Sequence, residues 1–541
     1  MPTPDLPELP RLPHLPLDGL LRRAALRAPG APALRIGAQT LTFGELDARA
    51  DRIAAYLECS VGRRGARVAV VNTLDADFAA VYYATVRSGN RVVVLNPLLS
   101  PARTAKVLAA ACAELAFAPR AVAEKLCALP DRPESLSLVL VTGAEDGGPV
   151  PGAAVPLDLV LDAVAPAAGT TAPRPPVTVD LDAEACVQFT TGTTASPKGV
   201  RLTHRGLVAN AVQTALVHRL GEDSVTVNHL PLYQPMHLNS AVYAGACQVL
   251  CPDPDPLASF ALAERTGATH YYGLPARLHR LAADERLRAG GPLPGLPAGP
   301  RLTAVLCGGS ALDPAAARTL AARLGVPVVQ GYGMTELSPL THCQRPDDPT
   351  GTGSVGAPVP GTECRVVHPD TGVPLAAGES GEVQVRGPQL MAGYLGSQEP
   401  PAGPDGWFST GDVGRIGPGG ELFLVDRLGD VFLHDGELVS PSAVERVLGG
   451  DPRVAECAVV GWPDPVHGAV TWAGIVLRDP GADPAPVLEQ IAERANERLA
   501  PYERIRRVEA IDAVPRTPVG KPVRGVLRRS VRGRAAAEAT V

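Results

Sequence analysis

The stretch RVAVVNTLDADFAAVYYATVRSGNRVVVL, residues 67–95, holds two apolar, β-branched runs on either side of a helical pattern. The runs Arg67–Val71 and Arg91–Leu95 lack the alternation of apolar and polar residues that a strand with one solvated face would have. Strands of this composition are buried on both faces and occur in parallel sheets covered by helices. The stretch therefore predicts a strand–helix–strand unit with parallel strands and a helix over residues 75–88.

The same alternation continues on both sides of this unit. A hairpin and a helix capped by Thr42 are predicted before it, and apolar runs at residues 115–118 and 138–142 follow it. A second series of strands and helices runs from His204 to Tyr332 and includes a predicted helix over residues 239–246. We expect two similar, doubly wound α/β sheets that pack together.

The residue pattern of the sequence changes after Gly353. Short alternating strands with many Gly and Pro turns predict a small antiparallel barrel, and an α+β pattern follows Arg427. We therefore expect an α/β protein with two domains. The large N-terminal domain, residues 1–426, would hold the two sheets and the barrel, and residues 427–541 would form a small α+β domain with its own core.

Composition excludes several classes of protein. A net charge of −6, from 50 basic and 56 acidic residues, argues against a sequence-independent nucleic-acid binder, which needs a basic face. No apolar run approaches the roughly 20 residues of a membrane span, and no signal pattern opens the chain, so a cytoplasmic location is expected. The arginines after residue 523 are interpreted as a solvated helix face, and the ten cysteines as small buried hydrophobes.

One loop has the composition of a phosphate-binding site. Residues 189–199, FTTGTTASPKG, place four threonines in five positions beside a glycine and a lysine. Phosphate oxygens need many short donors and a cation, and the backbone of a tight loop adds further N–H groups. The GxxxxGK[ST] spacing is absent, so a simple Ser/Thr-rich turn remains an alternative. Lysine is rare in this chain, which increases the interest of Lys198 and of Lys521 in a second Gly-containing loop.

Six short segments follow one another along the chain: LTFGEL (41–46), TTGTTASPKG (190–199), GYGMTE (331–336), STGD (409–412), DR (426–427) and PRTPVGK (515–521). In this order they resemble the motifs of the superfamily of AMP-forming acyl-CoA synthetases, peptide-synthetase adenylation domains and luciferases. The resemblance covers nearly the whole chain. It implies ATP and Mg²⁺ as cofactors and two half-reactions, with a mobile C-terminal domain that turns between them.

The resemblance implies how the nucleotide would be held. Tyr332 would stack on adenine, with the backbone of Gly308 and Gly309 on the other face. Asp412 would accept hydrogen bonds from both ribose hydroxyls, and Arg427 would contact the ribose or a phosphate. Core packing and turn formation are the alternative roles for Tyr332 and Asp412. The other implied nucleotide contacts are Thr190, Thr191, Gly192, Thr193, Thr194, Lys198 and Gly333.

Three residues are implied in catalysis and one in domain rotation. Thr335 would donate to the α-phosphate, and Glu336 would help hold Mg²⁺, which prefers carboxylate ligands. Lys521 would reach both the acid and the α-phosphate and stabilise the charge that develops during in-line attack. Gly429 stands where relatives often have Lys or Asp, and it would serve as the hinge or as a simple turn residue.

The acid would bind beside the segment after residue 230. Its Leu-Asn-Ser at 238–240 resembles the hydroxycinnamate CoA ligases, and the absence of a carboxylate from residues 233–238 argues against an α-amino acid. Gln234 replaces a histidine that is common in relatives. The mixture of side chains suits a planar aromatic or medium aliphatic acid. The implied pocket residues are Tyr233, Gln234, Met236, His237, Met334 and Leu340.

The sequence thus predicts a ligase that converts ATP and a small carboxylic acid (aryl, cinnamoyl-like or medium-chain acyl) into an acyl-adenylate and pyrophosphate. The acyl group would then pass to the thiol of CoA or of phosphopantetheine on a separate carrier protein. Two alternatives stay open: adenylation of an oxyacid such as nitrite for N–N bond formation on an arylamine, and a non-catalytic nucleotide-binding homologue. The presence of Glu336, Asp412 and Lys521 argues against the latter.

Overall fold

The chain divides into two compact units. The larger comprises Met1–Glu363 and Arg386–Gly406, and the smaller comprises Cys364–Val385 and Trp407–Val541. The predicted boundary between residues 426 and 427 stays a prediction. The computed structural model describes residues 8–143, 152, 154–163, 178–190, 197–229, 233–285, 302–479, 481, 483–516 and 522–538.

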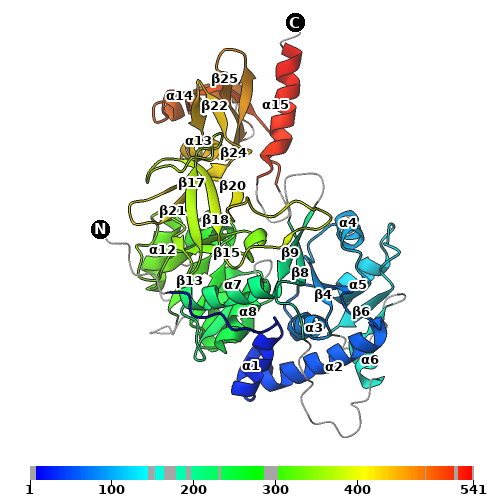
Figure 1. Cartoon of the computed structure of the whole chain (residues 1–541). Coiled ribbons are helices and arrows are strands. Elements are labelled where there is room, and N and C mark those ends of the chain that lie inside the picture. Colours follow the sequence, from blue (N-terminus) through cyan, green and yellow to red (C-terminus); the bar gives the residue numbers. More distant parts are fainter. Residues whose placement is uncertain are drawn as a thin grey trace. The chain divides into compact units, whose positions relative to one another are not determined.

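The larger unit contains an eight-stranded sheet (Figure 1). Its strands lie in the order β19 (Gly393–Tyr394), β9 (Lys198–Thr203), β8 (Glu184–Thr190), β4 (Arg91–Leu95), β3 (Arg67–Val71), β5 (Leu115–Pro119), β6 (Leu138–Thr142) and β7 (Val155–Pro156). The strands from β8 to β7 are parallel, and β9 and β19 are antiparallel additions at one edge. The helices that accompany the sheet are α2 (Phe43–Val61), α3 (Ala76–Arg87), α4 (Pro101–Ala111), α5 (Arg120–Cys127) and α6 (Leu157–Ala163).

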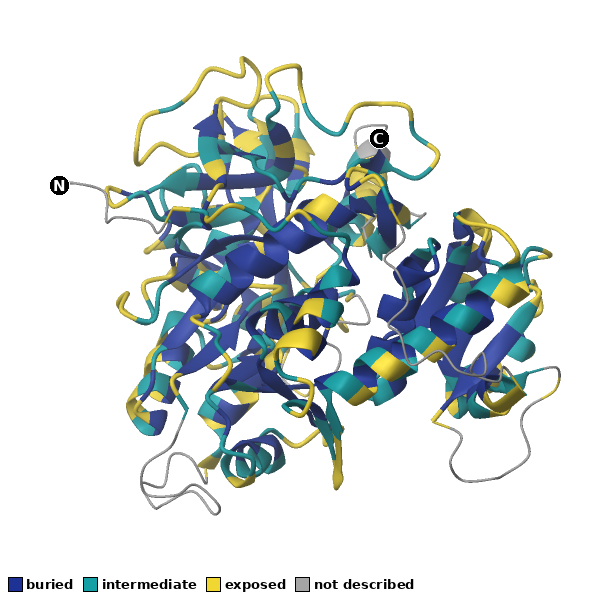
Figure 2. Ribbon diagram, turned by 60° about the horizontal axis from the view of Figure 1, so that its bottom comes forward, coloured by how far each residue is buried: buried dark blue, intermediate teal, exposed yellow. Residues whose placement is uncertain are grey.

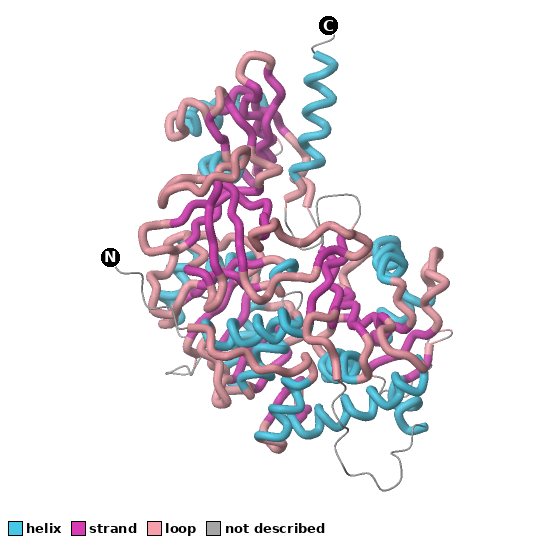
Figure 3. The backbone as a smooth tube through the Cα atoms, in the orientation of Figure 1, coloured by secondary structure: helices cyan, strands magenta, loops and turns pink. Residues whose placement is uncertain are grey.

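Helices cover both faces of this sheet (Figure 3). Ala69 and Val71 of β3 point to the face where α4 and α5 contribute Leu108 and Leu126 to one apolar cluster. Successive strand residues point to opposite faces, so Val70 lies on the face that α3 covers. Two covered faces explain why the runs at 67–71 and 91–95 are apolar after their first residue.

A second sheet of the larger unit has nine strands. Their order is β16 (Ala357–Pro358), β15 (Leu340–Cys343), β14 (Val328–Gly333), β13 (Ala304–Cys307), β12 (His270–Gly273), β10 (Val225–Asn228), β11 (Cys247–Leu250), β1 (Pro32–Ile36) and β2 (Gln39–Thr42). The strands from β14 to β1 are parallel, with antiparallel strands at both edges. The associated helices are α1 (Gly19–Arg27), α7 (His204–Val217), α8 (Pro235–Ala244), α9 (Pro256–Arg265), α10 (Pro275–Ala283) and α12 (Pro314–Leu324), with the 3₁₀ turn η1 (Thr335–Leu337).

The two sheets pack together through helices that are buried nearly all round. Most residues of α3, α7 and α8 are buried, as expected for helices between two layers. Tyr83 of α3 donates to Oδ1 of Asn239 on α8 at 2.9 Å, and Nδ2 of Asn239 donates to Tyr82 at 3.1 Å. The predicted pair of packed α/β sheets is confirmed.

Two helix starts test the capping analysis. The hydroxyl of Thr42 accepts from the N–H of Glu45 at 3.2 Å, and the Glu45 carboxylate accepts from the N–H of Thr42 at 2.8 Å, so the predicted cap is present. Helix α8 begins at Pro235, whereas the apolar pattern predicts a start at Asn239. Proline is favoured in the first helical turn because its missing N–H is not needed there.

The smaller unit has two sheets of its own. One runs β17 (Glu363–Val367), β18 (Gly381–Arg386), β20 (Phe408–Ile416) and β21 (Leu422–Arg427); the other runs β23 (Glu437–Val439), β22 (Phe432–His434), β25 (Gly468–Leu477) and β24 (Val454–Asp464), with β26 (Ile505–Ala510) paired to β25. The first is an open sheet, where the sequence predicts a barrel; four strands in a line leave two free edges. Three helices belong to this unit: α13 (Pro441–Leu448), α14 (Pro484–Asn496) and α15 (Arg524–Glu538).

Burial broadly follows these layers (Figure 2): the parallel strands of the two large sheets are mostly buried, whereas edge strands such as β2 and β26 are exposed in part. Val444 of α13, Ile475 of β25 and Ile491 of α14 belong to one cluster, so the α+β segment has the core of its own that its length predicts. None of the described helices is long and apolar enough to cross a membrane.

Ion pairs fix the start of helix α15, whereas Arg529 and Arg532 farther along it are exposed, as the predicted solvated face requires. The guanidinium of Arg524, whose side chain is 9% exposed, lies 2.5 Å from Glu445, 3.4 Å from Asp430 and 3.6 Å from Asp426. Arg528 pairs with Asp430 at 2.7 Å. A planar guanidinium with five donors can serve several carboxylates at once.

Replacing Arg524 by alanine should destabilise the smaller unit by about 3–5 kcal/mol, because three shielded carboxylates would lose their common cation. All three tryptophans, Trp407, Trp462 and Trp472, lie in this unit, so urea unfolding followed by tryptophan fluorescence reports on it selectively. The matched control is Arg529→Ala on the exposed side of the same helix, which should change stability by less than about 0.5 kcal/mol. Equal effects of the two changes would contradict the structural role of Arg524.

Candidate active site

The phosphate-type loop is the turn of an antiparallel hairpin. Strands β8 and β9 pair so that Thr190 lies opposite Lys198. Both residues therefore lie at the base of the loop, while Thr191, Gly192, Thr193 and Thr194 lie outside the described residues. A Cβ on Gly199 would come within 3.1 Å of Phe189 and Leu395, so a larger residue would disturb the packing beneath the loop.

The GYGMTE segment lies against this hairpin. Strand β14 ends at Gly333, and Thr335 and Glu336 follow in η1, which contacts β8 and β9. A Cβ on Gly333 would lie 2.0 Å from the carbonyl oxygen of Pro339, so only glycine fits there. The N–H of Met391 donates to the carbonyl oxygen of Glu336 at 2.9 Å and fixes the turn. The structure thus brings Glu336 close to the base of the loop.

Tyr394 joins these two parts. Its hydroxyl donates to Oε1 of Glu336 at 2.9 Å, and Nζ of Lys198 lies 5.0 Å from the centroid of its ring. Burial and the neighbouring charge of Glu336 raise the pKa of Tyr394 above its ordinary value of 10. The hydroxyl therefore stays protonated and remains a donor to the carboxylate near neutral pH.

The surroundings of Glu336 suit a hard cation. The residue is 7% exposed, and among the described residues no Lys, Arg or His pairs with its carboxylate. A buried carboxylate costs free energy unless a charge or several hydrogen bonds compensate it. Oxygen donors of this kind are the ligands that Mg²⁺ prefers, so Glu336 fits the predicted metal-binding role.

The predicted adenine contacts lie at neighbouring strand ends. Gly308 and Gly309 follow β13, and Tyr332 is near the end of the parallel strand β14. Gly309 has φ +90°, a conformation that favours glycine. The Tyr332 ring is 9% exposed and lies 5.8 Å from the ring of His342. The carboxyl ends of parallel strands are the usual ligand-binding edge of such sheets.

Asp412 and Arg427 belong to the smaller unit and are cross-strand partners on β20 and β21. Nε of Arg427 lies 2.7 Å from Oδ1 of Asp412, and the aspartate side chain is 8% exposed against 55% for the arginine. The arginine therefore holds the carboxylate that is predicted to bind ribose. Gly429 has no atom near a built Cβ and no positive φ, so nothing in this conformation requires glycine. Lys521 lies outside the described residues.

The predicted acid pocket is built at the start of α8. His237 packs edge-on against Tyr272 of β12 with ring centroids 4.6 Å apart. Met236 and Leu340 belong to the same apolar cluster as Tyr272. Burial lowers the pKa of His237 from 6.5 to about 3, so the imidazole is neutral at physiological pH. These groups form an aromatic and apolar environment without charge.

The other three predicted pocket residues differ in exposure. Tyr233 is 1% exposed, and its hydroxyl donates to Gln248 at 3.1 Å, so its polar end is bound within the interior. Gln234 is exposed immediately before α8, and its N–H donates to Nδ1 of His237 at 3.3 Å. Met334 is half-buried between Gly333 and η1.

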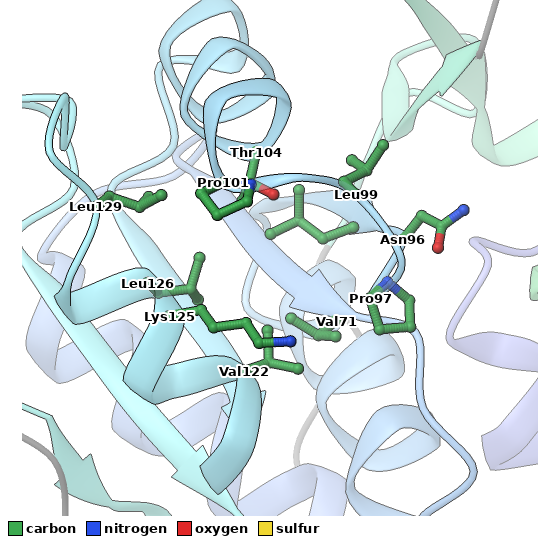
Figure 4. A pocket seen from close by; sticks show the side chains of 11 residues that line it. Val71, Asn96, Pro97, Leu99, Pro101, Thr104, Val122, Lys125, Leu126 and Leu129 are labelled. Atoms are coloured by element: carbon green, nitrogen blue, oxygen red, sulfur yellow. The ribbon is translucent and has the colours of Figure 1, made fainter. Parts of the chain in front are cut away.

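A separate cavity lies where β3 and β4 end, between α4 and α5 (Figure 4). Val71, Asn96 and Leu126 line it, and Lys125 extends along it. Its volume of about 20 Å³ has room for roughly one water molecule. It is too small for an acid or a nucleotide.

Two family models match this chain. Residues 21–395 match the model described as AMP-binding enzyme, and residues 443–521 match the model described as AMP-binding enzyme C-terminal domain. The chain belongs to the family of AMP-binding enzymes.

Named relatives of this AMP-binding enzyme are CoA ligases. It is 31% identical over 517 residues to 4-coumarate–CoA ligase 5 of Oryza sativa subsp. japonica, across 92% of this chain and 90% of that protein. It is 31% identical over 514 residues to feruloyl-CoA synthase of an Amycolatopsis species, across 94% and 97%. The crystal structure of ATP-bound MatB from Rhodopseudomonas palustris has a TM-score of 0.79 and 26% identity, across 95% of this chain and 99% of that one.

The family confirms the predicted class of enzyme. This AMP-binding enzyme is an AMP-forming ligase of the acid–thiol type, and its α/β fold is the predicted one. Its predicted use of ATP agrees with the ATP-bound relative. The roles of individual side chains stay predictions, and so do the acid and the acceptor.

Sequence reasoning missed Tyr394 and Tyr272. Nothing local links Tyr394 to Glu336, because 58 residues separate them and the contact depends on β19 pairing with β9. Tyr272 did carry a signal. It lies near the carboxyl end of a strand predicted to be parallel, where ligands of α/β sheets bind.

Changing Tyr394 to phenylalanine should lower kcat/KM for ATP roughly tenfold and raise the Mg²⁺ concentration needed for half-maximal activity, because a hydrogen bond to a charged group contributes about 1.5–3 kcal/mol. Steady-state adenylation rates at varied ATP and Mg²⁺ measure both effects. Tyr243→Phe is the control, since the Tyr243 hydroxyl has no hydrogen bond within the described part of the chain. Unchanged Mg²⁺ dependence in Tyr394→Phe would refute the orienting role.

Acid should destabilise the larger unit before most carboxylates are protonated. Burial lowers the pKa of His218, His237 and His342 from 6.5 to about 3, so the native state keeps them neutral while the unfolded chain binds protons below pH 6.5. Each should reduce the free energy of unfolding by about 1 kcal/mol between pH 6 and pH 5.

Urea unfolding followed by far-ultraviolet circular dichroism at several pH values tests this loss. In His342→Asn the loss over that interval should be about 1 kcal/mol smaller, because one of the three groups no longer titrates. A free energy of unfolding that stays constant from pH 6 to pH 5 would show that the histidines are not held neutral.

Proposed function

We propose that this enzyme activates a planar aromatic or medium-length aliphatic carboxylic acid as its adenylate and transfers the acyl group to the thiol of CoA. The arrangement of Lys198, Tyr394 and Glu336 supports this proposal most directly. It joins a cation at the base of the threonine-rich loop to a buried carboxylate through one tyrosine. Binding a triphosphate with its metal ion requires both charges within a short distance of each other.

In the first half-reaction a carboxylate oxygen of the acid attacks the α-phosphorus of ATP, and the bond to pyrophosphate breaks. Lys198 and the loop threonines hold the phosphates, and Thr335 donates to the α-phosphate. Glu336 would hold Mg²⁺ in part, and the ion when bound would supply positive charge for the phosphate oxygens. Lys521 stabilises the negative charge that develops on the oxygens of the reacting phosphate.

The ribose contacts come from the smaller unit. The Asp412 carboxylate accepts from the ribose hydroxyls while Arg427 orients it through their 2.7 Å contact. In the second half-reaction the sulfur of CoA attacks the acyl carbon, and the bond to AMP breaks. CoA is the acceptor in the names of the two sequence relatives, whereas nothing specific supports a carrier protein or an arylamine.

The character of the pocket supports an acid with an uncharged body. Tyr272, Met236 and Leu340 are apolar or aromatic, and His237 is neutral at physiological pH. A second charge on the substrate would be desolvated there without a partner, which costs several kcal/mol. Coumarate and ferulate, the acids in the relatives' names, each consist of a planar aromatic body and a carboxylate, so we place hydroxycinnamate-like acids first.

ATP–pyrophosphate exchange tests the first half-reaction. Hydroxycinnamates, benzoates and medium-chain fatty acids should support exchange, and α-amino acids should not. In Lys521→Ala, exchange should fall at least about 100-fold while ATP binding persists, because the lysine acts mainly on the transition state. Lys106→Ala, an exposed lysine on α4, is the matched control and should be fully active.

Mass spectrometry of the products then identifies the acceptor. The proposal predicts an acyl-CoA and AMP when CoA is supplied with the preferred acid. Exchange without thioester formation, or product only with nitrite and an arylamine, would refute the proposed acceptor. ATP binding without exchange for any acid would refute catalysis by adenylation altogether.

A further inference from the structure

Three side chains with metal-binding atoms converge in the smaller unit, on residues outside the site proposed above for the ligase reaction. His434 ends β22, Asp435 follows it in the turn to β23, and His467 lies in the turn between β24 and β25. One ligand atom from each lies within 4.8 Å of the others. His434 is buried, while Asp435 and His467 are exposed, so the cluster is open to solvent on one side.

The backbone holds the two turns together. Asp435 and Gly436 have φ of +53° and +82°, the conformation of a two-residue type I′ hairpin, for which Asp-Gly is a favoured sequence. The N–H of Asp435 donates to the carbonyl oxygen of His467 at 3.1 Å. Oδ1 of Asp464 accepts from the N–H groups of Val466 and His467 at 2.9 Å each and fixes the second turn. The three side chains are therefore positioned before any ligand arrives.

The contacts of His434 determine where its lone pair points. Nδ1 lies 2.8 Å from the carbonyl oxygen of Ala469, which can only accept, so Nδ1 carries the proton. The lone pair of the neutral ring is then on Nε2, which lies 3.7 Å from Oδ2 of Asp435. Both atoms are acceptors, one of them on a side chain only 8% exposed, and their separation allows one cation to bind both.

His467 supplies the third ligand atom. Its Nδ1 lies 2.8 Å and 3.0 Å from the two oxygens of Asp435, and its ring stacks on that of His434 with centroids 4.9 Å apart and an angle of 27°. The aspartate is thus shared by both imidazoles. A proton on His467 now occupies the place that a cation would take, so metal binding would displace that proton.

We propose that His434, Asp435 and His467 form a binding site for a divalent transition-metal ion of the Zn²⁺ type. Two imidazole nitrogens and a carboxylate oxygen are a common set of three protein ligands for such ions, and water fills the remaining positions. Ligand atoms around tetrahedral Zn²⁺ lie about 3.4 Å apart, close to the spacing already present between Nε2 of His434 and Oδ2 of Asp435. The Ala469 carbonyl is the outer hydrogen-bond partner that orients a ligating histidine.

This site differs from the predicted Mg²⁺ site in its ligand chemistry. Glu336 and phosphate oxygens suit a hard ion, whereas imidazoles favour Zn²⁺, Co²⁺ or Ni²⁺. A bound ion would also link the hairpin after β22 to the turn before β25, and binding to the folded state alone would stabilise the smaller unit.

Isothermal titration of the chelator-treated full chain with ZnCl₂, without ATP or Mg²⁺, tests the proposal. All proteins carry Cys59→Ser and Cys112→Ser, because these two exposed thiols would also bind Zn²⁺. The parent should bind one equivalent that is lost, or weakened at least about tenfold, in Asp435→Asn and in His467→Ala. Asn-Gly suits the same type I′ turn, so Asp435→Asn should fold normally.

The control is His368→Ala, which removes an exposed turn histidine in the same unit and should leave binding unchanged. Two independent readouts accompany the titration. Co²⁺ should give visible absorption bands with the parent and with His368→Ala only, and Zn²⁺ should raise the urea midpoint of the tryptophan transition in the same two proteins only. No binding by the parent, equal binding by Asp435→Asn and His467→Ala, or equal loss in His368→Ala would overturn the proposal.

Discussion

The burial of one carboxylate constrains the whole centre of the larger unit. Glu336 is 7% exposed, and the hydroxyl of Tyr394 is the side-chain partner that the described residues offer it. Holding it there requires three distant segments to meet: the β8–β9 hairpin, the turn η1 and the short strand β19. Gly333 allows the chain to pass against Pro339 just before that turn. A cation that binds to Glu336, as proposed, would relieve the cost of its burial.

The sequence alone predicted the position of those elements whose structure depends mainly on their own residues. Runs such as 67–71 and 91–95 have the predicted bounds because each is apolar after its first arginine and is followed by an asparagine. The capping box at Thr42 is a local arrangement and was equally predictable. Where a boundary depends on packing, the prediction shifted: α8 starts at Pro235, since proline at a helix start carries no apolar periodicity.

The motifs of the candidate site were predictable from the sequence, but the long-range contacts between their side chains were not. The order of the motifs located Thr190, Lys198 and Glu336. The tyrosine that contacts Lys198 and Glu336 is 58 residues from Glu336, and only strand pairing brings it there. Arg524 is a similar case. Its position in an arginine-rich segment suggests a solvated helix, and only the fold surrounds it with Asp426, Asp430 and Glu445. Long-range ion pairs and hydrogen bonds produce no periodic pattern of residues from which they could be predicted.

The four lysines show how well amino-acid composition alone identifies functional residues. Four lysines occur in the chain: Lys198 beside Tyr394, Lys521 in a motif, Lys106 exposed on α4, and Lys125 along a cavity of about 20 Å³. Rarity alone would have ranked all four equally, although the two on α4 and α5 contact no proposed ligand. What separates Lys198 is its place at the end of a threonine-rich hairpin, where an ammonium with three rotatable donors can follow phosphate oxygens as they move. At Arg524, by contrast, a rigid, planar guanidinium pairs with several carboxylates at once.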